Sequence, residues 1–447
     1  MKNTRAYFPV LMALLISVSS AQPPVKNPRI ASMVSEVSQA NLKAIAERLV
    51  SFGTRHSLSD TVSSHRGIGA ARRWIASELS RYAAASGGRM SVGFHETVVP
   101  PSGRIPSPTN IVNVVATLRS RIYPDRILVI GGHYDSRAGN AMDSTSDAPG
   151  ANDDGSGTAV VLELARIMAK HEFDATIVFI AFAAEEQGLL GAAAWAEMAA
   201  QKGWNVEAMF NNDIVGNSMG GDGIAEKQYV RLFSEAFSPQ DTGSVFRFRN
   251  SLGLENDGPS RTLARWIDET AAVYVPAFDV KMVYRRDRFL RGGDHSAFHT
   301  KGFPAVRFSV ARENYDWQHQ NVRVEDGKQY GDLVQFMDFG YCANVARVNL
   351  AGLAALALAP APVGGAGVVT SNLEYKTTLR WNRSAEPDLA GYFVRYRETT
   401  SPVWQHRQFV TDTTMTLNVL KDDHVFGVQG VDREGNAGLI VTPRPVR

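Results

Sequence analysis

Residues 177–188 read IVFIAFAAEEQG, in which eight mostly apolar residues lead directly into two adjacent glutamates, Glu185 and Glu186. A short, continuous apolar run of this kind predicts a strand that is buried on both faces, as in a parallel sheet. Paired carboxylates at the end of a buried strand gather like charge where desolvation is costly, unless a cation lies nearby. The stretch therefore predicts a buried strand whose carboxyl end needs a positively charged partner.

Strand-like and helix-like patterns alternate on both sides of this stretch. Alternation of this kind indicates a three-layer α/β/α domain around a mainly parallel mixed sheet, which we expect over residues 22–358. Within it, the Gly-rich stretch 217–260 breaks the alternation and is expected to be an insertion or lid. We expect further strands at 109–118, 125–132, 205–216, 278–284 and 303–310, and helices at 34–52, 68–82, 156–170, 188–200, 261–274 and 332–359.

The composition changes after residue 358. Residues 359–367 read APAPVGGAG, which is typical of a Pro/Gly-rich linker. Short alternating runs between turn-rich spacers follow over residues 368–447 and predict a small all-β sandwich. LRWN (379–382), DLAGYFVRYRE (388–398) and VFGVQGVDREGNAG (425–438) resemble a fibronectin type III module. That resemblance implies a fold, and the partner we consider for such a module is a cell surface or a polymer.

The N-terminus has the features of a secretory signal peptide over residues 1–21. Lys2 and Arg5 precede an apolar run from Tyr7 to Val18, and small residues follow that run. The run is short for a membrane span. The alternative to a cleaved signal peptide is an uncleaved N-terminal anchor. We expect no membrane span in the rest of the chain. The protein is therefore expected to be secreted or periplasmic.

The charge balance gives no support for a nucleic-acid partner, because 47 basic and 45 acidic residues leave a formal net charge of +2. The single cysteine, Cys342, excludes both an intrachain disulfide and a cysteine-based zinc site. It lies in an apolar helical pattern, so we expect a buried, unreactive thiol. Stability must therefore come from packing, with help from bound metal.

Side chains that can bind metal follow the predicted strands at their carboxyl ends. In an open α/β sheet these ends face one crevice, so residues that follow different strands can converge there. Histidine and carboxylate ligands suit zinc, and a carboxylate-rich set suits a pair of divalent cations, which would also neutralise the paired glutamates. The residues concerned are His133, Asp135, Asp153, Asp154, Glu185, Glu186, Asp213 and His319.

Five motifs in a fixed order carry a resemblance to a known family. They are GGHYDS (131–136), PGANDDGSG (149–157), FAAEEQG (182–188), NNDIVG (211–216) and RGGDHSAFHTKGFPAVRF (291–308). In this order they resemble the M28 family of zinc peptidases, most of which are aminopeptidases. The resemblance spans roughly residues 40–355, and five ordered motifs are much harder to meet by chance than one.

The resemblance implies an assignment of site residues on the zinc exopeptidase fold. Two Zn²⁺ ions are implied, although other divalent cations suit such a site. Glu185 is the implied general base for a water molecule that the two ions activate. The peptide between Asp153 and Asp154 is typically cis in the family. The implied metal ligands are His133 and Asp213 for one ion, Glu186 and His319 for the other, and Asp153 as the bridge; the implied supporting residues are Asp135, Asp154, Asp294 and His295.

The last ligand has alternatives, because the residues after His319 differ from the usual family pattern. His295 and His299 are the rivals, but the final ligand normally follows the strand that reads FPAVRF, which favours His319. Some relatives have a tyrosine immediately before this ligand, where it assists the oxyanion. Here that position is Gln318, and Tyr315 is the remaining candidate for the donor.

The leading expectation is a secreted metallo-aminopeptidase whose substrates are the N-termini of peptides or proteins. The alternatives are a glutaminyl-cyclase-like or carboxypeptidase member of the same superfamily, and a nonenzymatic binding protein on this scaffold. Retention of every implied ligand and of the base argues against a nonenzymatic role. We expect the specificity pocket to be formed by loops, including 217–260 and 284–293.

Overall fold

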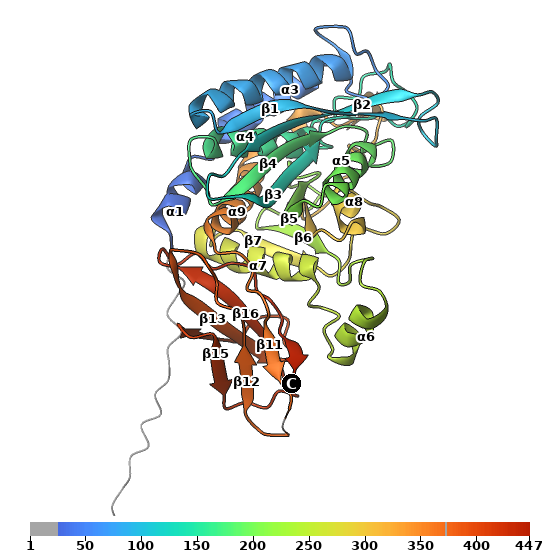
Figure 1. The fold of residues 1–447 in the computed structure, drawn as a ribbon. Helices are drawn as coiled ribbons and strands as arrows, with labels where there is room; N and C mark the ends of the chain where they lie inside the picture. The colour runs from blue at the N-terminus through green and yellow to red at the C-terminus, as the bar shows by residue number, and fades with distance from the viewer. Residues whose placement is uncertain (1–25, 372) are drawn as a thin grey trace, which may run out of the picture.

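The computed structural model describes residues 26–371 and 373–447, so the predicted signal peptide at 1–21 lies outside the described residues. A larger unit is built around one sheet, and a smaller β unit follows at the C-terminus (Figure 1). The helices are α1 (Pro28–Ser35), α2 (Gln39–Val50), α3 (Gly67–Ala83), α4 (Gly155–Met168), α5 (Leu190–Gln201), α6 (Gly243–Ser251), α7 (Pro259–Tyr274), α8 (His295–Thr300) and α9 (Phe339–Leu358). The strands of the large sheet are β1 (Met90–Val99), β2 (Thr109–Leu118), β3 (Tyr123–His133), β4 (Ala175–Phe182), β5 (Asn205–Asn212), β6 (Tyr229–Ser234), β7 (Asp279–Val283) and β8 (Ala305–Ser309).

The large sheet is mixed, with the strand order β1-β2-β4-β3-β5-β8-β6-β7. Its centre is parallel, because β4, β3, β5 and β8 run in one direction. β1 and β2 form an antiparallel ribbon that pairs antiparallel with β4. At the other edge, β6 pairs antiparallel with β8 and parallel with β7. The predicted parallel arrangement is therefore found in the centre of the sheet, and the edges depart from it.

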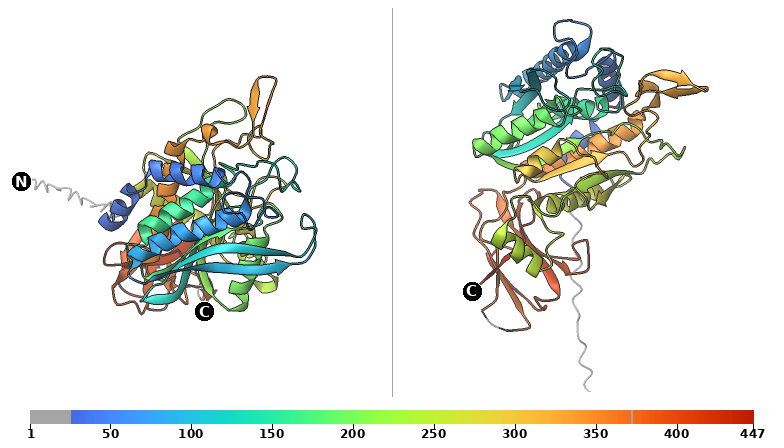
Figure 2. Two further views of the ribbon diagram at one scale, coloured as in Figure 1. Left: turned by 90° about the horizontal axis from the view of Figure 1, so that it is seen from above. Right: turned by 90° about the vertical axis from the view of Figure 1, so that its right-hand side faces the viewer.

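Strand β4 carries the stretch IVFIAF and separates two hydrophobic cores. Ile177 and Phe179 belong to the core shared with α2, α4 and α9, whereas Val178 and Phe182 belong to the core shared with α5 and α8. All four side chains are at most 3% exposed. Helices therefore cover both faces of the sheet in three layers (Figures 1 and 2). The prediction of a strand buried on both faces is confirmed.

Among the described residues, helix α9 is long and apolar enough to cross a membrane by length and composition, which differs from our expectation for the chain beyond residue 21. However, 89% of the apolar window is buried inside the fold. α9 contacts α1, α2, α4 and α7, so its place in the core explains its apolarity. Cys342 lies on this helix as a buried free thiol, as predicted.

The stretch 217–260, expected as an insertion or lid, is partly built into the sheet. Its strand β6 lies between β8 and β7. Its helix α6 lies beside the C-terminal unit (Figure 1), and Leu252 and Leu254 line a cavity together with Val368 and Thr442 of that unit. This part of the chain therefore extends toward the C-terminal unit.

The C-terminal unit consists of two small sheets, with strand orders β15-β12-β11-β17 and β14-β13-β16. Trp381, Tyr392 and Val428 belong to the core that the two sheets share. Val363, in the segment expected as a linker, is 6% exposed and belongs to the same core. The strands of this unit are β11 (Gly367–Val369), β12 (Thr377–Arg380), β13 (Leu389–Glu398), β14 (His406–Val410), β15 (Thr414–Leu417), β16 (His424–Asp432) and β17 (Arg444–Val446).

A separate hairpin, which precedes α9 in the chain, joins β9 (Arg323–Glu325) to β10 (Lys328–Tyr330).

The C-terminal unit packs against helix α7 of the larger unit. Trp266 donates a hydrogen bond from its indole to the carbonyl of Ala437 at 3.1 Å, and Arg265 donates to the carbonyl of Pro402 at 2.7 Å. Both α7 side chains are at most 5% exposed. The two units therefore share a closely packed boundary.

Candidate metal centre

The predicted site residues meet at the carboxyl ends of the central parallel strands. Several of these ends turn sharply. Ala184 precedes Glu185 after β4, Ile214 follows Asp213 after β5, and both have positive φ values, 59° and 60°. His319, in the loop after β8, has a φ of 53°. Residues with side chains rarely adopt this conformation, and it recurs at functional sites.

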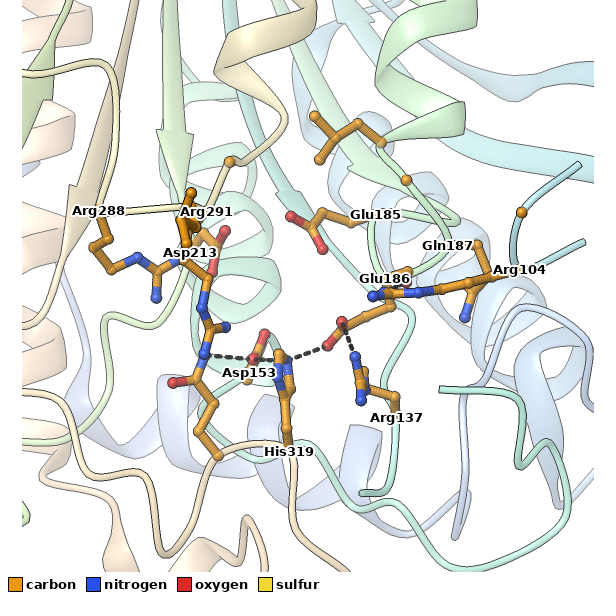
Figure 3. A pocket seen from close by; sticks show the side chains of 16 residues that line it. Arg104, Arg137, Asp153, Glu185, Glu186, Gln187, Asp213, Arg288, Arg291 and His319 are labelled. Carbon is orange, nitrogen blue, oxygen red and sulfur yellow. Dashed lines mark hydrogen bonds and ion pairs between the residues drawn. The ribbon is translucent and has the colours of Figure 1, made fainter. Parts of the chain in front are cut away.

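The side chains form two groups of potential metal ligands, with all donor atoms in a group within 4.8 Å of one another. Asp153 lies between the groups. Its Oδ1 is 3.2 Å from Nε2 of His133. Its Oδ2 is 3.0 Å from Nε2 of His319, which in turn lies 2.9 Å from Oε1 of Glu186 (Figure 3). The groups are His133, Glu185 and Asp213, and Asp153, Glu186 and His319.

The rivals of His319 face other partners. His299 Nε2 lies 2.9 Å from the carbonyl of Phe237 and 3.0 Å from Oε2 of Glu235. His295 Nε2 lies 2.8 Å from the carbonyl of Arg286. Neither histidine belongs to a ligand group in the described chain, whereas His319 does.

Asp135 connects the histidine at the end of β3 to the two glutamates. Nδ1 of His133 lies 3.1 Å from the carbonyl of Asp135 and 3.5 Å from its Oδ1. The carboxylate of Asp135 also accepts hydrogen bonds from the backbone N–H groups of Glu185 at 3.2 Å and Glu186 at 3.1 Å. A partner at Nδ1 orients the imidazole and leaves Nε2 toward the ligand group. Asp135 therefore contacts both the His133 imidazole and the backbone of the two glutamates.

Asp154 holds the loop on which Asp153 lies. Its carboxylate accepts from the N–H of Gly157 as the N-cap of α4, and from the N–H groups of His133 and Ile214. The Asp153–Asp154 peptide is cis, as the family resemblance implies. The two adjacent acids therefore face different neighbours, Asp153 the ligand groups and Asp154 the backbone around them.

Asp294 and His295 lie at the start of α8 and are at most 2% exposed. Neither carboxylate oxygen of Asp294 has a hydrogen-bond partner in the described chain. Burial raises the pKa of Asp294 to about 8, although His133 acts in the opposite direction. Burial lowers the pKa of His295 to about 4. Both side chains are thus buried beside the ligand groups without belonging to them.

The clustered carboxylates create the electrostatic conflict that the sequence predicts. Burial lowers the pKa of His319, but the carboxylates of Glu186 and Asp153 outweigh burial and raise it to about 9. Burial together with the charges of Asp213 and Glu186 raises the pKa of Glu185 well above its ordinary value, against the influence of His133. The site therefore favours added positive charge.

Arg307 is a site residue that the sequence analysis missed. It is fully buried on β8, with Nη2 3.0 Å from Oδ1 of Asp213 and Nη1 2.7 Å from Oδ2 of Asp287. A carboxylate has about four acceptor positions, so this pair leaves Asp213 with room for a further partner. An arginine inside the apolar strand FPAVRFSV was the available signal, because a buried charge requires a partner.

Asp332 and Gln318 were also missed as partners of Asp153. Asp332 is 7% exposed and accepts the backbone N–H of Asp153 at 2.7 Å. Gln318 donates from Nε2 to Oδ2 of Asp153 at 3.0 Å. Tyr315, the other candidate donor, is 58% exposed and does not line the cavity. The sequence order around His319 gave no sign of either contact.

A cavity of about 630 Å³ opens onto the ligand groups. Residues of the loop 284–293 line it, as expected, and so does Arg104 from the loop between β1 and β2. No described residue of 217–260 lines it, so the expectation that this stretch shapes the pocket is wrong. The stretch instead supplies β6 and contacts the C-terminal unit, which keeps it away from the cavity.

Comparisons with known proteins agree with the arrangement of the site. The model of peptidase family M28 matches residues 113–323. A probable zinc metalloprotease of Leptosphaeria maculans is 46% identical over 94% of this chain and 98% of the relative. A probable zinc metalloprotease of Pyricularia oryzae is 44% identical over 96% of this chain and 86% of the relative.

Solved structures share the fold. LapB of Legionella pneumophila has a TM-score of 0.55 at 21% identity and covers 75% of this chain and 76% of its own. The LapA aminopeptidase of the same organism has a TM-score of 0.52 at 18% identity and covers 76% of this chain and 78% of its own. The family model and the relatives together place the protein in the class of zinc metallopeptidases. The chain belongs to peptidase family M28.

Proposed function

We propose that this protein is a secreted metallo-aminopeptidase that removes the N-terminal residue from peptides, with two zinc ions and Glu185 as the general base. The observation that carries the proposal is the position of Asp153, whose two oxygens face His133 and His319 respectively. A carboxylate in this position can bridge two cations, as in two-metal hydrolases.

The donor set fits zinc. His133 and Asp213 would hold one ion and Glu186 and His319 the other, with Asp153 shared between them. Histidine nitrogens and carboxylate oxygens are the ordinary ligands of catalytic zinc, and cobalt or manganese could occupy the same set. Bound zinc supplies Lewis acidity and lowers the pKa of a bound water molecule toward neutrality. The names of the fungal relatives, probable zinc metalloproteases, support the choice of metal.

Glu185 acts as the proton carrier in this proposal. It lines the cavity next to Glu186, and the Asp135 carboxylate holds the backbone of both residues. A carboxylate in this position can take a proton from the attacking water and deliver it to the leaving amine. Glu186 then remains available as a ligand, which divides two roles between adjacent acids.

The choice of the N-terminal residue as the target rests on the ordered motifs and on the LapA neighbour, which is described as an aminopeptidase. The C-terminal unit is proposed to be a fibronectin type III-like module. Its close packing on α7 favours a structural role over a flexible tether. Secretion is proposed from residues 1–21 alone.

The test is a zinc count on the purified protein together with assays on paired substrates, before and after chelation. We expect about two zinc ions per chain and chelator-sensitive release of the first residue from unblocked peptides but not from their N-acetylated forms. One zinc with cyclisation of N-terminal glutamine would assign the protein to the cyclases. Release from the C-terminus of acetylated peptides would assign it to the carboxypeptidases. N-terminal sequencing of the exported protein checks cleavage after Ala21.

A further inference from the structure

Arginines are the other charged groups of the cavity. Its lining includes Arg104, Arg137, Arg288 and Arg291 in addition to the ligand groups. Figure 3 shows Arg104 and Arg137 on the side of Glu186, and Arg288 and Arg291 on the side of Asp213. Arg104 comes from the β1–β2 loop, and Arg288 and Arg291 come from the β7–α8 loop. Loops distant in the sequence therefore bring positive charge to one opening.

Two of these arginines are already engaged. Arg288 has Nε 3.0 Å from Oδ1 of Asp287 and Nη1 2.6 Å from Oε2 of Glu313. Arg137 donates to the carbonyls of Ala138 and Gly139, and its Nη1 is 3.9 Å from Oε2 of Glu186. The guanidinium groups of Arg137 and Arg288 are therefore largely engaged by partners within the protein.

The other two arginines have donors to spare. Arg104 is exposed and, within the part of the chain that the structure describes, makes one side-chain hydrogen bond, from Nη1 to the carbonyl of Glu186 at 2.6 Å. Arg291 is exposed, and its guanidinium has no hydrogen bond or ion pair within the described chain. A guanidinium carries five N–H donors, so most of this capacity faces the cavity and solvent.

The charge balance of the cavity leaves these arginines without an acidic partner. Among the described residues, the acids of the lining are Asp153, Glu185, Glu186 and Asp213. Two zinc ions would match these four negative charges with four positive charges. Arg104 and Arg291 then give the opening an excess of positive charge, which attracts anionic ligands into a cleft with low-dielectric walls.

We propose that Arg291, with Arg104 across the cavity, binds a carboxylate of the substrate close to the scissile peptide bond. The proposal rests on the proposed peptidase function and adds a preference for acidic substrates to it. Arginine is suited to this task because its planar fork matches a carboxylate with two parallel hydrogen bonds. The carboxylate can come from an acidic N-terminal side chain or from the free C-terminus of a very short peptide.

The test measures kcat and KM on two pairs of substrates. Glu-Ala-Ala-amide and Gln-Ala-Ala-amide differ only in the side-chain charge, and Leu-Gly and Leu-Gly-amide differ only in the terminal charge. We expect a preference of about tenfold or more in kcat/KM for the charged member of at least one pair, carried mainly by KM. The pair that shows the preference identifies the source of the carboxylate.

Variants connect the preference to the arginines. Arg291→Gln should reduce the ratio of kcat/KM within that pair toward one, because the charged member loses more than the neutral member does, and Arg291→Lys should keep part of the ratio. Arg383→Gln is the matched control, because Arg383 is exposed in the C-terminal unit and its loss removes the same charge. Arg104→Gln tests the opposite side of the cavity.

A binding measurement gives a readout without turnover. Calorimetry with L-glutamate and L-glutamine on the zinc-loaded protein should show tighter binding of L-glutamate if the side chain is the source, with the difference lost in Arg291→Gln. Equal kcat/KM within both substrate pairs, or a preference that persists in Arg291→Gln and Arg104→Gln, overturns the proposal even where the aminopeptidase activity is present. Failure to cleave any unblocked peptide overturns the proposed function instead. The affinity for L-glutamate, which carries both a side-chain and a terminal carboxylate, then decides the question: equal binding by the parent protein and Arg291→Gln overturns the proposal as well.

Discussion

Asp257 of the larger unit and Arg397 of the C-terminal unit form a buried ion pair, with Nη2 of Arg397 2.7 Å from both carboxylate oxygens. Their side chains are 1% and 4% exposed. Asp257 also lies 3.2 Å from Nη1 of Arg265 on α7. One buried carboxylate therefore pairs with two guanidinium groups at the boundary, one from each unit.

Asp257→Asn should destabilise the whole protein. The variant leaves Arg397 and Arg265 buried without their anionic partner, and breaking a buried pair in this way costs about 3–5 kcal/mol. Denaturant unfolding followed by circular dichroism should show a clearly lower midpoint. The matched control is Asp222→Asn, because Asp222 pairs with Arg312 at the surface, where such pairs contribute about 1 kcal/mol or less. Equal midpoints for both variants would contradict a structural role for the boundary.

Glu185→Gln should abolish most of the activity without loss of metal. The amide keeps the shape of the side chain but cannot take the proton of the attacking water, which costs about 10²–10⁴-fold in kcat. The zinc content and the melting temperature should stay close to those of the parent protein. Glu197→Gln serves as the control, since Glu197 is a partly exposed residue of α5 that pairs with Lys301 away from the ligand groups. A loss of zinc in Glu185→Gln would instead mark this residue as a ligand.

His319→Ala should lower the zinc content from about two ions to about one per chain. His319 and Glu186 form one ligand group, and the other group keeps His133 and Asp213. Metal analysis after dialysis measures the change, and Asp153→Asn should weaken both sites because Asp153 faces both groups. His65→Ala is the control, because His65 is exposed and outside the groups. Full zinc content in His319→Ala would exclude this histidine as a ligand.

The strand-end residues could be predicted because each follows an apolar run that is itself readable as a buried strand. His133, Glu186 and Asp213 need only the rule that parallel strands present their carboxyl ends to one crevice. His319 needs the chain order as well, since its loop lies outside any such run. The residues alone therefore predict that these side chains converge, whereas their division between two ions was implied only by the family resemblance.

The supporting contacts could not be predicted because they join residues that are far apart in the sequence. Asp332 supports Asp153 through a loop after β10, and nothing near Asp332 marks it as a partner. The same limit explains the stretch 217–260, whose irregular composition hides β6. β6 forms because it pairs with β8 and β7, and a local sequence pattern does not reveal such pairing between distant segments.

Asp268 on α7 should make the stability of the protein depend on pH. Burial raises the pKa of Asp268 to about 6, and the charges of Glu269 and Asp279 add to the effect. The pKa of an aspartate in an unfolded chain is about 3.9, so the folded protein binds this proton more tightly than the unfolded chain does. Stability from this group is therefore full below about pH 4 and is lost as the pH rises to about 6.

Asp268→Asn removes that loss, so the variant should be more stable than the parent protein above pH 6 and no more stable below pH 4. After a discount for solvent screening of a partly exposed group, the gain at pH 8 is on the order of 1 kcal/mol. Melting temperatures measured at pH 4 and pH 8 check the sign and the window. Asp125→Asn is the control, because Asp125 is exposed and its substitution removes the same charge. A stability gain in Asp268→Asn that is equal at both pH values would show that the ionisation of Asp268 is not its cause.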